Sequence, residues 1–463
     1  MAEVHLPLQD SLQAASPAVP GSLEPRLVAF VCRWCTYAGA DLAGTSRMTY
    51  PPNVRTLMLP CTGRIDVAFI LRAFLEGADG VLVSGCHPGD CHYTAGNYRA
   101  RRRWILLRDL LDTIGVDLRR LQLAWISAAE GAKWVKTIQN FTDEMRQLGR
   151  YEPMQRLAAD FTPELALADG QPNGYAALPA AAPVAVHADS PLGQALAQAL
   201  QAGAVKAILG WKKQATLGRP QAACIVDSQA IVELVIPPRA GNLARLFKHP
   251  EIRQIQPIGV ITRRAEALAM NVLIQEKQLD PGRVVAFAVD GAGKFLGLAD
   301  PPGALKKIEA AEASVPPPDP GASTTGLWAA LDRLMAQPRE ERWAFWMKQA
   351  QKCIRCYACR GACPLCNCHE CLMDKNVPQW FPTAADGPGN FAWQLIRAFH
   401  LAGRCIGCGS CQEACPAGIP LGLLDAAMMR SVWKHFGYRS GMDPAAAPLQ
   451  SDFRTDDRAE FIL

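Results

Sequence analysis

The sequence of 463 residues contains no apolar run long enough to cross a membrane. A spanning helix needs about 18 or more consecutive apolar residues, and charged residues or prolines interrupt every apolar run before that length. The first residues, Met1–Pro7, also lack the basic start and apolar core of a secretory signal. We therefore expect a cytoplasmic protein without a membrane span.

Neither sign of charge dominates the chain. It has 48 Lys and Arg against 43 Asp and Glu, so the formal net charge is only +5. This balance gives no support to nucleic-acid binding. We interpret the one local basic run as a solvated helix face or a subunit docking surface. The run consists of Arg99, Arg101, Arg102, Arg103 and Arg108.

A clear phosphate-binding loop is missing as well. The segment Asp290–Gly297 follows an expected strand, but it fits neither the GxGxxG nor the GxxxxGK[ST] spacing. The chain also reaches Pro301 soon afterwards, which leaves little room for a crossover helix. We predict a structural turn there.

Cysteine, in contrast, is abundant, with 17 residues. Eight of them form two runs of the pattern C-x2-C-x2-C-x3-C-P. In bacterial two-cluster ferredoxins with this spacing, the fourth cysteine of each run ligates the other 4Fe-4S cluster. Zinc sites, the alternative, need two C-x2-C pairs instead. We predict two 4Fe-4S clusters, one held by Cys353, Cys356, Cys359 and Cys415 and the other by Cys405, Cys408, Cys411 and Cys363.

Three more cysteines, Cys366, Cys368 and Cys371, directly follow the first run. They could hold a third cluster or another metal together with a further residue. They could also exchange with ligands of the two expected clusters, or pack near them without binding metal. The sequence leaves these three alternatives open.

The length predicts about three domains. Runs of alternating strand and helix character predict two α/β units, the first with an open parallel sheet, followed by a mostly α ferredoxin-like dicluster domain. A helix is expected over Thr325–Gln351. The predicted boundaries are a flexible tail at 1–25, an iron-sulfur domain at 26–148, a linker at 149–180, a middle domain at 181–310, a Pro-rich linker at 311–324 and the dicluster domain at 325–463.

In the first domain, three expected strands end at a cysteine. Leu27–Val31 precedes Cys32, Arg55–Leu59 precedes Cys61 by two residues, and Gly80–Ser84 precedes Cys86 by two. Cys35 and Cys91 lie just downstream. Ligands of open α/β sheets sit beyond the carboxyl ends of the strands. Five thiols should therefore converge there, and four of them would suffice for a cluster.

The middle domain is expected to be poor in metal ligands, because its one cysteine, Cys224, is most simply a core residue. Its expected strands are Val184–His187, Ala222–Val226, Ile231–Ile236, Ile258–Thr262 and Val284–Val289, and its expected helices are Leu192–Gln201, Gly241–Phe247 and Arg263–Gln278.

The first domain resembles the delta subunit of methyl-viologen-reducing hydrogenase, which works with heterodisulfide reductase. The segments that carry the resemblance are Cys32–Asp41, Leu59–Asp66, Gly80–Tyr93 and Trp125–Gly131. The resemblance implies a 2Fe-2S cluster on Cys61, Cys86 and Cys91, with Cys32 or Cys35 in the fourth place. His87 and His92 flank these cysteines, and either could replace a thiolate or donate a hydrogen bond to the cluster or a partner.

The segment Cys353–Cys371 resembles iron-sulfur proteins that are fused to, or encoded beside, such delta subunits. Related modules occur in the beta subunits of formate dehydrogenase and of deazaflavin-dependent hydrogenase. In those beta subunits the region that corresponds to the middle domain can hold a flavin. A flavin is not expected here, because the middle domain lacks a phosphate loop.

The favoured hypothesis is an electron-transfer subunit. It would relay electrons between an oxidoreductase of the hydrogenase or formate dehydrogenase type and a heterodisulfide reductase-like flavoprotein; such assemblies include flavin-based bifurcating complexes. One alternative is a flavin- or deazaflavin-dependent enzyme subunit with its active site in the middle domain. A structural zinc-rich assembly protein is the other.

Overall fold

The computed structural model describes residues 24–162, 182–213, 220–238, 240–312 and 326–463. The predicted tail at 1–25 and the predicted Pro-rich linker at 311–324 lie almost wholly outside these residues. Most of the predicted linker at 149–180 lies outside them as well.

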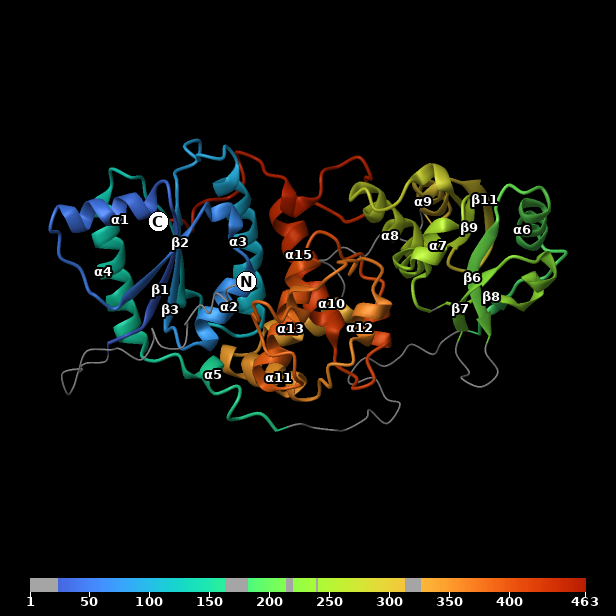
Figure 1. The fold of residues 1–463 in the computed structure, drawn as a ribbon. Coiled ribbons are helices and arrows are strands. Elements are labelled where there is room, and N and C mark those ends of the chain that lie inside the picture. Colours follow the sequence, from blue (N-terminus) through green and yellow to red (C-terminus); the bar gives the residue numbers. More distant parts are fainter. Residues whose placement is uncertain (1–23, 163–181, 214–219, 239, 313–325) are drawn as a thin grey trace, which may run out of the picture.

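The first unit is built on an open sheet of four parallel strands in the order β2-β1-β3-β4, which confirms the predicted architecture. Helices α1 and α4 pack together on one face of the sheet, and α2 and α3 cover the other (Figure 1). The elements are β1 (Leu27–Cys32), α1 (Thr36–Thr45), β2 (Val54–Leu59), α2 (Val67–Leu75), β3 (Gly80–Gly85), α3 (Gly96–Thr113), β4 (Leu121–Trp125) and α4 (Gly131–Leu148).

The middle unit is a mixed sheet in the order β11-β10-β9-β6-β8-β5, with β7 paired to β6. Two of its strands, β6 and β11, were not among the predicted ones. Gly210 interrupts the apolar pattern of β6, and its missing side chain leaves room for Leu234 and Ile261. The strands are β5 (Val184–Ala185), β6 (Ala207–Lys213), β7 (Pro220–Ile225), β8 (Leu234–Ile236), β9 (Ile258–Thr262), β10 (Val284–Val289) and β11 (Phe295–Ala299).

The segment after β10 is the turn of a β-hairpin. The carboxylate of Asp290 accepts hydrogen bonds from the backbone N–H groups of Ala292 and Lys294 at 3.0 and 2.8 Å, and β11 then runs antiparallel to β10. Helix α9 starts at Pro301, where Asp300 caps it and proline fits the first helical position. The helices of the unit are α6 (Pro191–Gln201), α7 (Pro250–Gln254), α8 (Arg264–Gln275) and α9 (Pro301–Ala311).

The C-terminal module is mostly helical, as predicted. The helix expected over Thr325–Gln351 is divided in two, because Pro338 disfavours helical geometry at the residue before it. The helices are α10 (Gly326–Met335), α11 (Arg339–Gln351), α12 (Ala358–Ala362), α13 (Gly387–His400), α14 (Ser410–Glu413) and α15 (Leu421–Phe436). Among the residues described, no helix is long and apolar enough to span a membrane.

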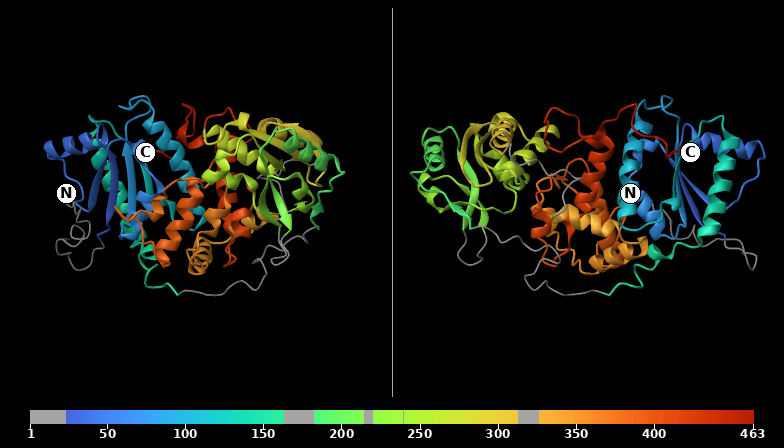
Figure 2. Two further views of the ribbon diagram at one scale, coloured as in Figure 1. Left: turned by 45° about the vertical axis from the view of Figure 1, so that its right-hand side comes forward. Right: turned by 180° about the vertical axis from the view of Figure 1, so that it is seen from behind.

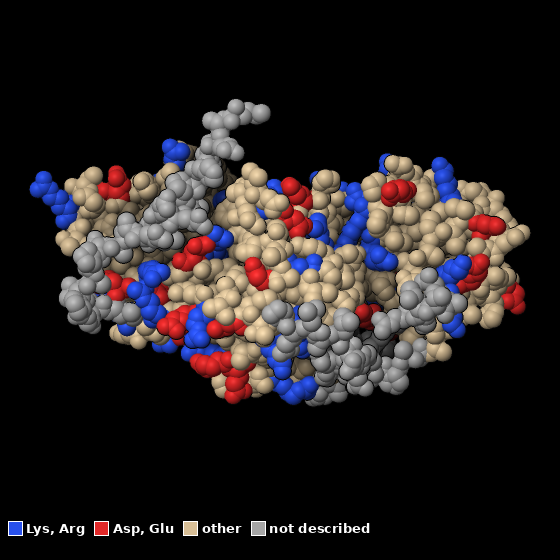
Figure 3. Space-filling view, turned by 60° about the horizontal axis from the view of Figure 1, so that its bottom comes forward, with Lys and Arg blue, Asp and Glu red and all other residues tan. Residues whose placement is uncertain are grey.

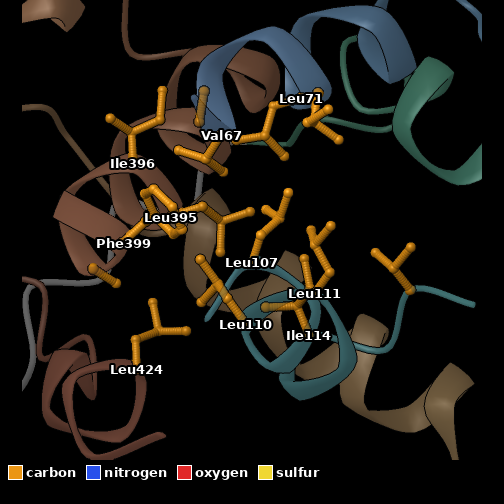
Figure 4. Packing of buried hydrophobic residues seen from close by; sticks show 14 of the residues in the cluster. Val67, Leu71, Leu107, Leu110, Leu111, Ile114, Leu395, Ile396, Phe399 and Leu424 are labelled. Carbon is orange, nitrogen blue, oxygen red and sulfur yellow. The ribbon is translucent and has the colours of Figure 1, made fainter. Parts of the chain in front are cut away.

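The spatial order of the units differs from their order in the chain. The C-terminal module lies between the other two units in all three ribbon views (Figures 1 and 2). Its helix α13 packs against α2, and α15 packs against α3 (Figure 4). One continuous hydrophobic cluster thus joins the first unit to the C-terminal module; it includes Val67, Leu71, Leu107, Leu110, Leu395, Ile396, Phe399 and Leu424.

The basic run on α3 is a docking surface within the chain. Arg101 and Arg102 are each only 3% exposed. Arg102 donates to Asp457 at 2.6 Å, and Arg101 donates to the carbonyl of Arg454 at 2.6 Å. The last residue, Leu463, exchanges backbone hydrogen bonds with the edge strand β4. The C-terminal segment therefore fastens the module to the first unit.

Replacing Phe399 with alanine should lower the free energy of unfolding by about 3–5 kcal/mol, the usual cost of removing a buried phenyl ring. Because the cluster around Phe399 is shared, we expect the first unit and the C-terminal module to unfold in one transition at a lower denaturant concentration. Guanidinium unfolding followed by circular dichroism measures this. The control Leu298→Ala, at a residue 48% exposed, should change stability by less than about 0.5 kcal/mol. Separate transitions for the two units would contradict a shared core.

Candidate metal centres

The five cysteines of the first unit converge at the carboxyl ends of its strands. Cys32 ends β1, and Cys61 and Cys86 follow β2 and β3. The Sγ atoms of Cys32 and Cys86 are 3.6 Å apart, and those of Cys61 and Cys91 are 3.7 Å apart. Cys35 also hydrogen-bonds to Cys86. This convergence is the one expected from the ends of three parallel strands.

These thiols do not ionise independently. The hydrogen bond from Cys86 lowers the pKa of Cys32 to about 6. Burial raises the pKa of Cys61 to about 11, and the hydrogen bond to Cys32 together with burial raises the pKa of Cys86 far above its usual range. The group therefore stabilises one negative charge and opposes a second. Several thiolates could coexist here only with a cation, as metal binding provides, so the residues present fit an iron-sulfur cluster.

Two polar residues hold the loop that follows β3. Asn97 donates from its side-chain amide to the carbonyls of Cys86 and His87 at 3.1 and 2.6 Å. His87 contacts Glu130 at 2.7 Å, and a backbone N–H of Ser127 together with His87 lowers the pKa of Glu130 to about 2. These contacts direct the His87 ring toward a carboxylate and fix the loop on α4.

The second flanking histidine lies in an aromatic group. The His92 ring stacks on Trp34 with 3.8 Å between ring centroids, and it meets Tyr93 edge-on. Sequence reasoning missed the supporting residues Asn97 and Glu130. Their contacts are made across loops. Glu130 lies in a segment that carries the family resemblance, but the local pattern does not show which residue it contacts.

The cysteines of the first expected ferredoxin set line one small pocket. Burial raises the pKa of Cys353 and of Cys359, and the neighbouring Cys415 raises each further. Cys415 thus lies beside cysteines that precede it by more than 50 residues. The four cysteines among the lining residues are Cys353, Cys356, Cys359 and Cys415.

The second expected set is also brought together. Burial raises the pKa of Cys405, Cys408 and Cys411, and in each case the nearby Cys363 raises it further. Cys363, from the first run, therefore lies near three thiols of the second run. A cubane suits such sets, because each thiolate binds a different iron.

The two cysteine loops share one backbone shape. Positive φ angles occur at Arg355 and Tyr357 in the first loop and at Gly407 and Gly409 in the second. Each residue of the first pair has its counterpart 52 positions later in the second loop. Glycine adopts this region freely, whereas arginine and tyrosine do so at a cost. Arg355 is held by a 2.6 Å hydrogen bond to the carbonyl of Gly389 and lies over the rings of Tyr357 and Trp393.

The three additional cysteines lie next to the second set. Cys366 has Cys363 and Cys371 as charged neighbours, and Cys371 has Cys368. Within the described ranges, no three His, Cys, Asp or Glu side chains are close enough to hold a single metal ion. The contacts therefore do not choose among the alternatives for these cysteines.

Residues 27–149 match the family model described as methyl-viologen-reducing hydrogenase, delta subunit. The iron-sulfur D-subunit of the vhc F420-non-reducing hydrogenase of Methanococcus voltae is 52% identical over 126 residues, which are 27% of this chain and 88% of that protein. The chain belongs to the delta-subunit family. The corresponding iron-sulfur D-subunit of Archaeoglobus profundus is 47% identical over 129 residues, which are 28% of this chain and 94% of that protein.

This family member is extended by a second iron-sulfur module, since residues 345–416 match a 4Fe-4S dicluster domain. The delta-type domain is also similar to part of a longer protein. It is 46% identical over 125 residues to the A-subunit of the Ferredoxin/F(420)H(2)-dependent CoB-CoM heterodisulfide reductase of Methanosarcina acetivorans, of which the chain spans only 16%. The chain is thus an iron-sulfur electron-transfer protein related to subunits of heterodisulfide reductase and of F420-non-reducing hydrogenase.

Replacing Gly96 with alanine should prevent an iron-sulfur cluster from binding to the cysteines of the delta-type domain. A Cβ at this position would overlap Cys61 Sγ and lie 3.2 Å from Cys91 Sγ, so the thiols would have to move apart. We expect the amount of bound iron to fall by the iron content of one cluster, while both 4Fe-4S signals persist in electron paramagnetic resonance (EPR). Gly44→Ala in α1, where a Cβ meets nothing within 4 Å, is the matched control. Unchanged iron in the Gly96 variant would contradict this packing.

Proposed function

We propose that the chain relays electrons between an oxidoreductase of the hydrogenase or formate dehydrogenase type and a heterodisulfide reductase-like flavoprotein, in a flavin-based bifurcating complex. The observation that carries the proposal is the direct packing of the dicluster module on the delta-type domain through one shared core. A relay needs its carriers on adjacent rigid bodies, and this packing supplies them. The names of the relatives, which are hydrogenase and heterodisulfide reductase subunits, support the two kinds of partner.

The cofactors in this proposal are one 2Fe-2S cluster and two 4Fe-4S clusters, each of which carries one electron when bound. For the 2Fe-2S cluster we propose Cys32, Cys61, Cys86 and Cys91 as ligands. Burial supports this choice, because these four thiols are buried whereas Cys35 is partly exposed. For the 4Fe-4S clusters the ligand sets are those that the two loops bring together.

The polypeptide around the thiols has two tasks. It keeps water away, since Cys353, Cys359 and Cys411 are buried in the shared core, and it donates hydrogen bonds to sulfur, as Gln394 does to Cys353 Sγ at 3.5 Å. The backbone N–H of Gly407 donates similarly to Cys405 Sγ at 3.4 Å. Such donors stabilise the more negative, reduced state of a cluster.

Exposed aromatic residues border the delta-type cysteines. Trp34 and Tyr37 are each 43% exposed, and Tyr93 is 53% exposed. Exposed aromatic groups of this kind are typical of protein interfaces. They support this rim as the surface on which the flavoprotein docks.

The crossed ligand sets predict which variants share a phenotype. Cys415→Ser should remove the same EPR signal as Cys353→Ser, although the two residues belong to different sequence runs. Cys363→Ser should remove the other 4Fe-4S signal together with Cys408→Ser. EPR of the reduced variants, with iron analysis, measures this. If Cys415→Ser instead removed the signal that depends on Cys408, the sets would follow the sequence runs and the partition would be wrong.

Anaerobic purification from the native host at mild salt tests the function itself. We expect a heterodisulfide reductase-like flavoprotein and a hydrogenase or formate dehydrogenase subunit to co-elute, as mass spectrometry would identify. In Cys86→Ala, the 2Fe-2S signal should vanish, both 4Fe-4S signals should remain, and electrons should no longer reach the flavoprotein. A lone protein with stoichiometric bound flavin would instead place an active site in the middle unit.

A further inference from the structure

Arg397 is a buried cation whose interactions within the polypeptide are incomplete. It is 4% exposed, and its Nη2 donates to the carboxylate oxygens of Asp425 at 3.3 and 3.4 Å. Its Nε and Nη1 have no hydrogen-bond partner among the described residues. Buried donors without acceptors are costly, so the surroundings of Arg397 call for negative charge beyond Asp425.

Helix α13 runs from one cysteine set to the other, and Arg397 lies on it between the two sets. One turn before it, Gln394 donates to Cys353 Sγ of the first set. One turn after it, the carbonyl of Leu401 accepts a 2.7 Å hydrogen bond from the backbone N–H of Cys405, in the second set. Residues three to four positions apart share a helix face. Arg397 therefore lies midway between the two sets.

The charged neighbours of Arg397 agree with this position. Burial alone would lower the pKa of the guanidinium. Asp425 and the thiolates of Cys411, Cys359 and Cys363 outweigh burial and raise the pKa well above its usual range. Cys359 belongs to the first set, and the other two cysteines belong to the second.

We propose that Arg397 is an electrostatic bridge between the two 4Fe-4S clusters that raises the reduction potentials of both, and that Asp425 offsets it at the second cluster. The proposal rests on the cluster ligands proposed above. Asp425 lies on the side of the second set, because its Oδ2 is 3.2 Å from Cys411 Sγ. The Arg397–Asp425 pair thus gives the first cluster the higher reduction potential, so an electron shared by the two clusters resides mainly on the first.

The physical basis is the charge change on reduction. When an electron passes between the clusters, one cluster loses one electron and the other gains it, and no bond forms or breaks. Each gain makes a cluster more negative, so a nearby cation stabilises the reduced state and a nearby anion opposes it. Both side chains are almost fully buried, so salt screens them poorly.

The inference also assigns a direction within the dicluster module. Cys363 and Cys405 of the second set contact the hydrophobic core of the middle unit, and among the described residues no cysteine of the first set does so. Cys411 of the second set belongs to the core shared with the delta-type domain, as Cys353 and Cys359 of the first set do. The second set therefore lies on the middle-unit side of the module. Basic side chains also lie on the surface where the module meets the middle unit (Figure 3). Salt screens such exposed charges, so they affect the cluster potentials less than the buried pair of Arg397 and Asp425 does. A higher potential at the first cluster would favour electron transfer from the middle-unit side toward the delta-type domain.

An EPR-monitored redox titration of the full chain under anaerobic conditions tests the proposal, with the two 4Fe-4S signals assigned through Cys415→Ser and Cys363→Ser. Arg397→Gln should shift both clusters toward the oxidised form by about tenfold or more at a fixed solution potential, which is about 59 mV for a one-electron couple. Arg397→Lys keeps the charge and should largely restore both potentials. Asp425→Asn should shift in the opposite direction, mostly at the second cluster.

Arg342→Gln is the matched control for loss of a buried arginine. Arg342 is 6% exposed and pairs with Asp112 at 2.9 Å, but it lies eleven residues before Cys353, about 16 Å of helix rise. The Arg342→Gln variant should leave the reduction potentials of both 4Fe-4S clusters unchanged. If both 4Fe-4S signals persist but the potentials change in neither Arg397→Gln nor Asp425→Asn, the inference about Arg397 and Asp425 is wrong. The proposed function would still stand. A wild-type chain without 4Fe-4S signals overturns the proposed function as well.

Discussion

Helix α13 is the element on which the rest of the molecule depends, because it packs on both sides at once. One side meets α2 of the delta-type domain through Leu395, Ile396 and Phe399. Polar residues on the same helix contact the cysteine loops, as Asn390 does by donating to the carbonyl of Cys353 at 2.7 Å. A helix buried nearly all round is fixed in position, so it holds the clusters at a set place relative to the sheet.

Much of the fold could be predicted from local sequence. The strands of the delta-type domain read as short apolar runs, and the observed β1, β2 and β3 agree with them within one residue at each end. The spacing of the cysteines also predicted that Cys363 and Cys415 lie near thiols of the other run, because a ferredoxin loop leaves its fourth cysteine turned toward the other cluster. In both cases, a few consecutive residues encode the result.

The remainder depends on contacts between distant residues. The role of Gly96 requires knowing that α3 begins against Cys61, which is 35 residues earlier. The place of the C-terminal module between the other units requires the match of α13 to α2, which are separated by about 320 residues. The pairing of Arg102 with Asp457 is of the same kind, since the basic run on α3 reads equally well as a solvated face.

The backbone pairing of Leu463 with Leu123 and Trp125 has a topological consequence. Strand β4 is an edge of its sheet, and an open edge can recruit a strand from another molecule. Here, part of that edge is occupied by a segment of the same chain. Leu463 is thus hydrogen-bonded to the same sheet that contains Leu27 in β1, so these contacts close the backbone between the two residues into a ring. A single proteolytic cut in the middle unit would open that ring without releasing either fragment from the shared core.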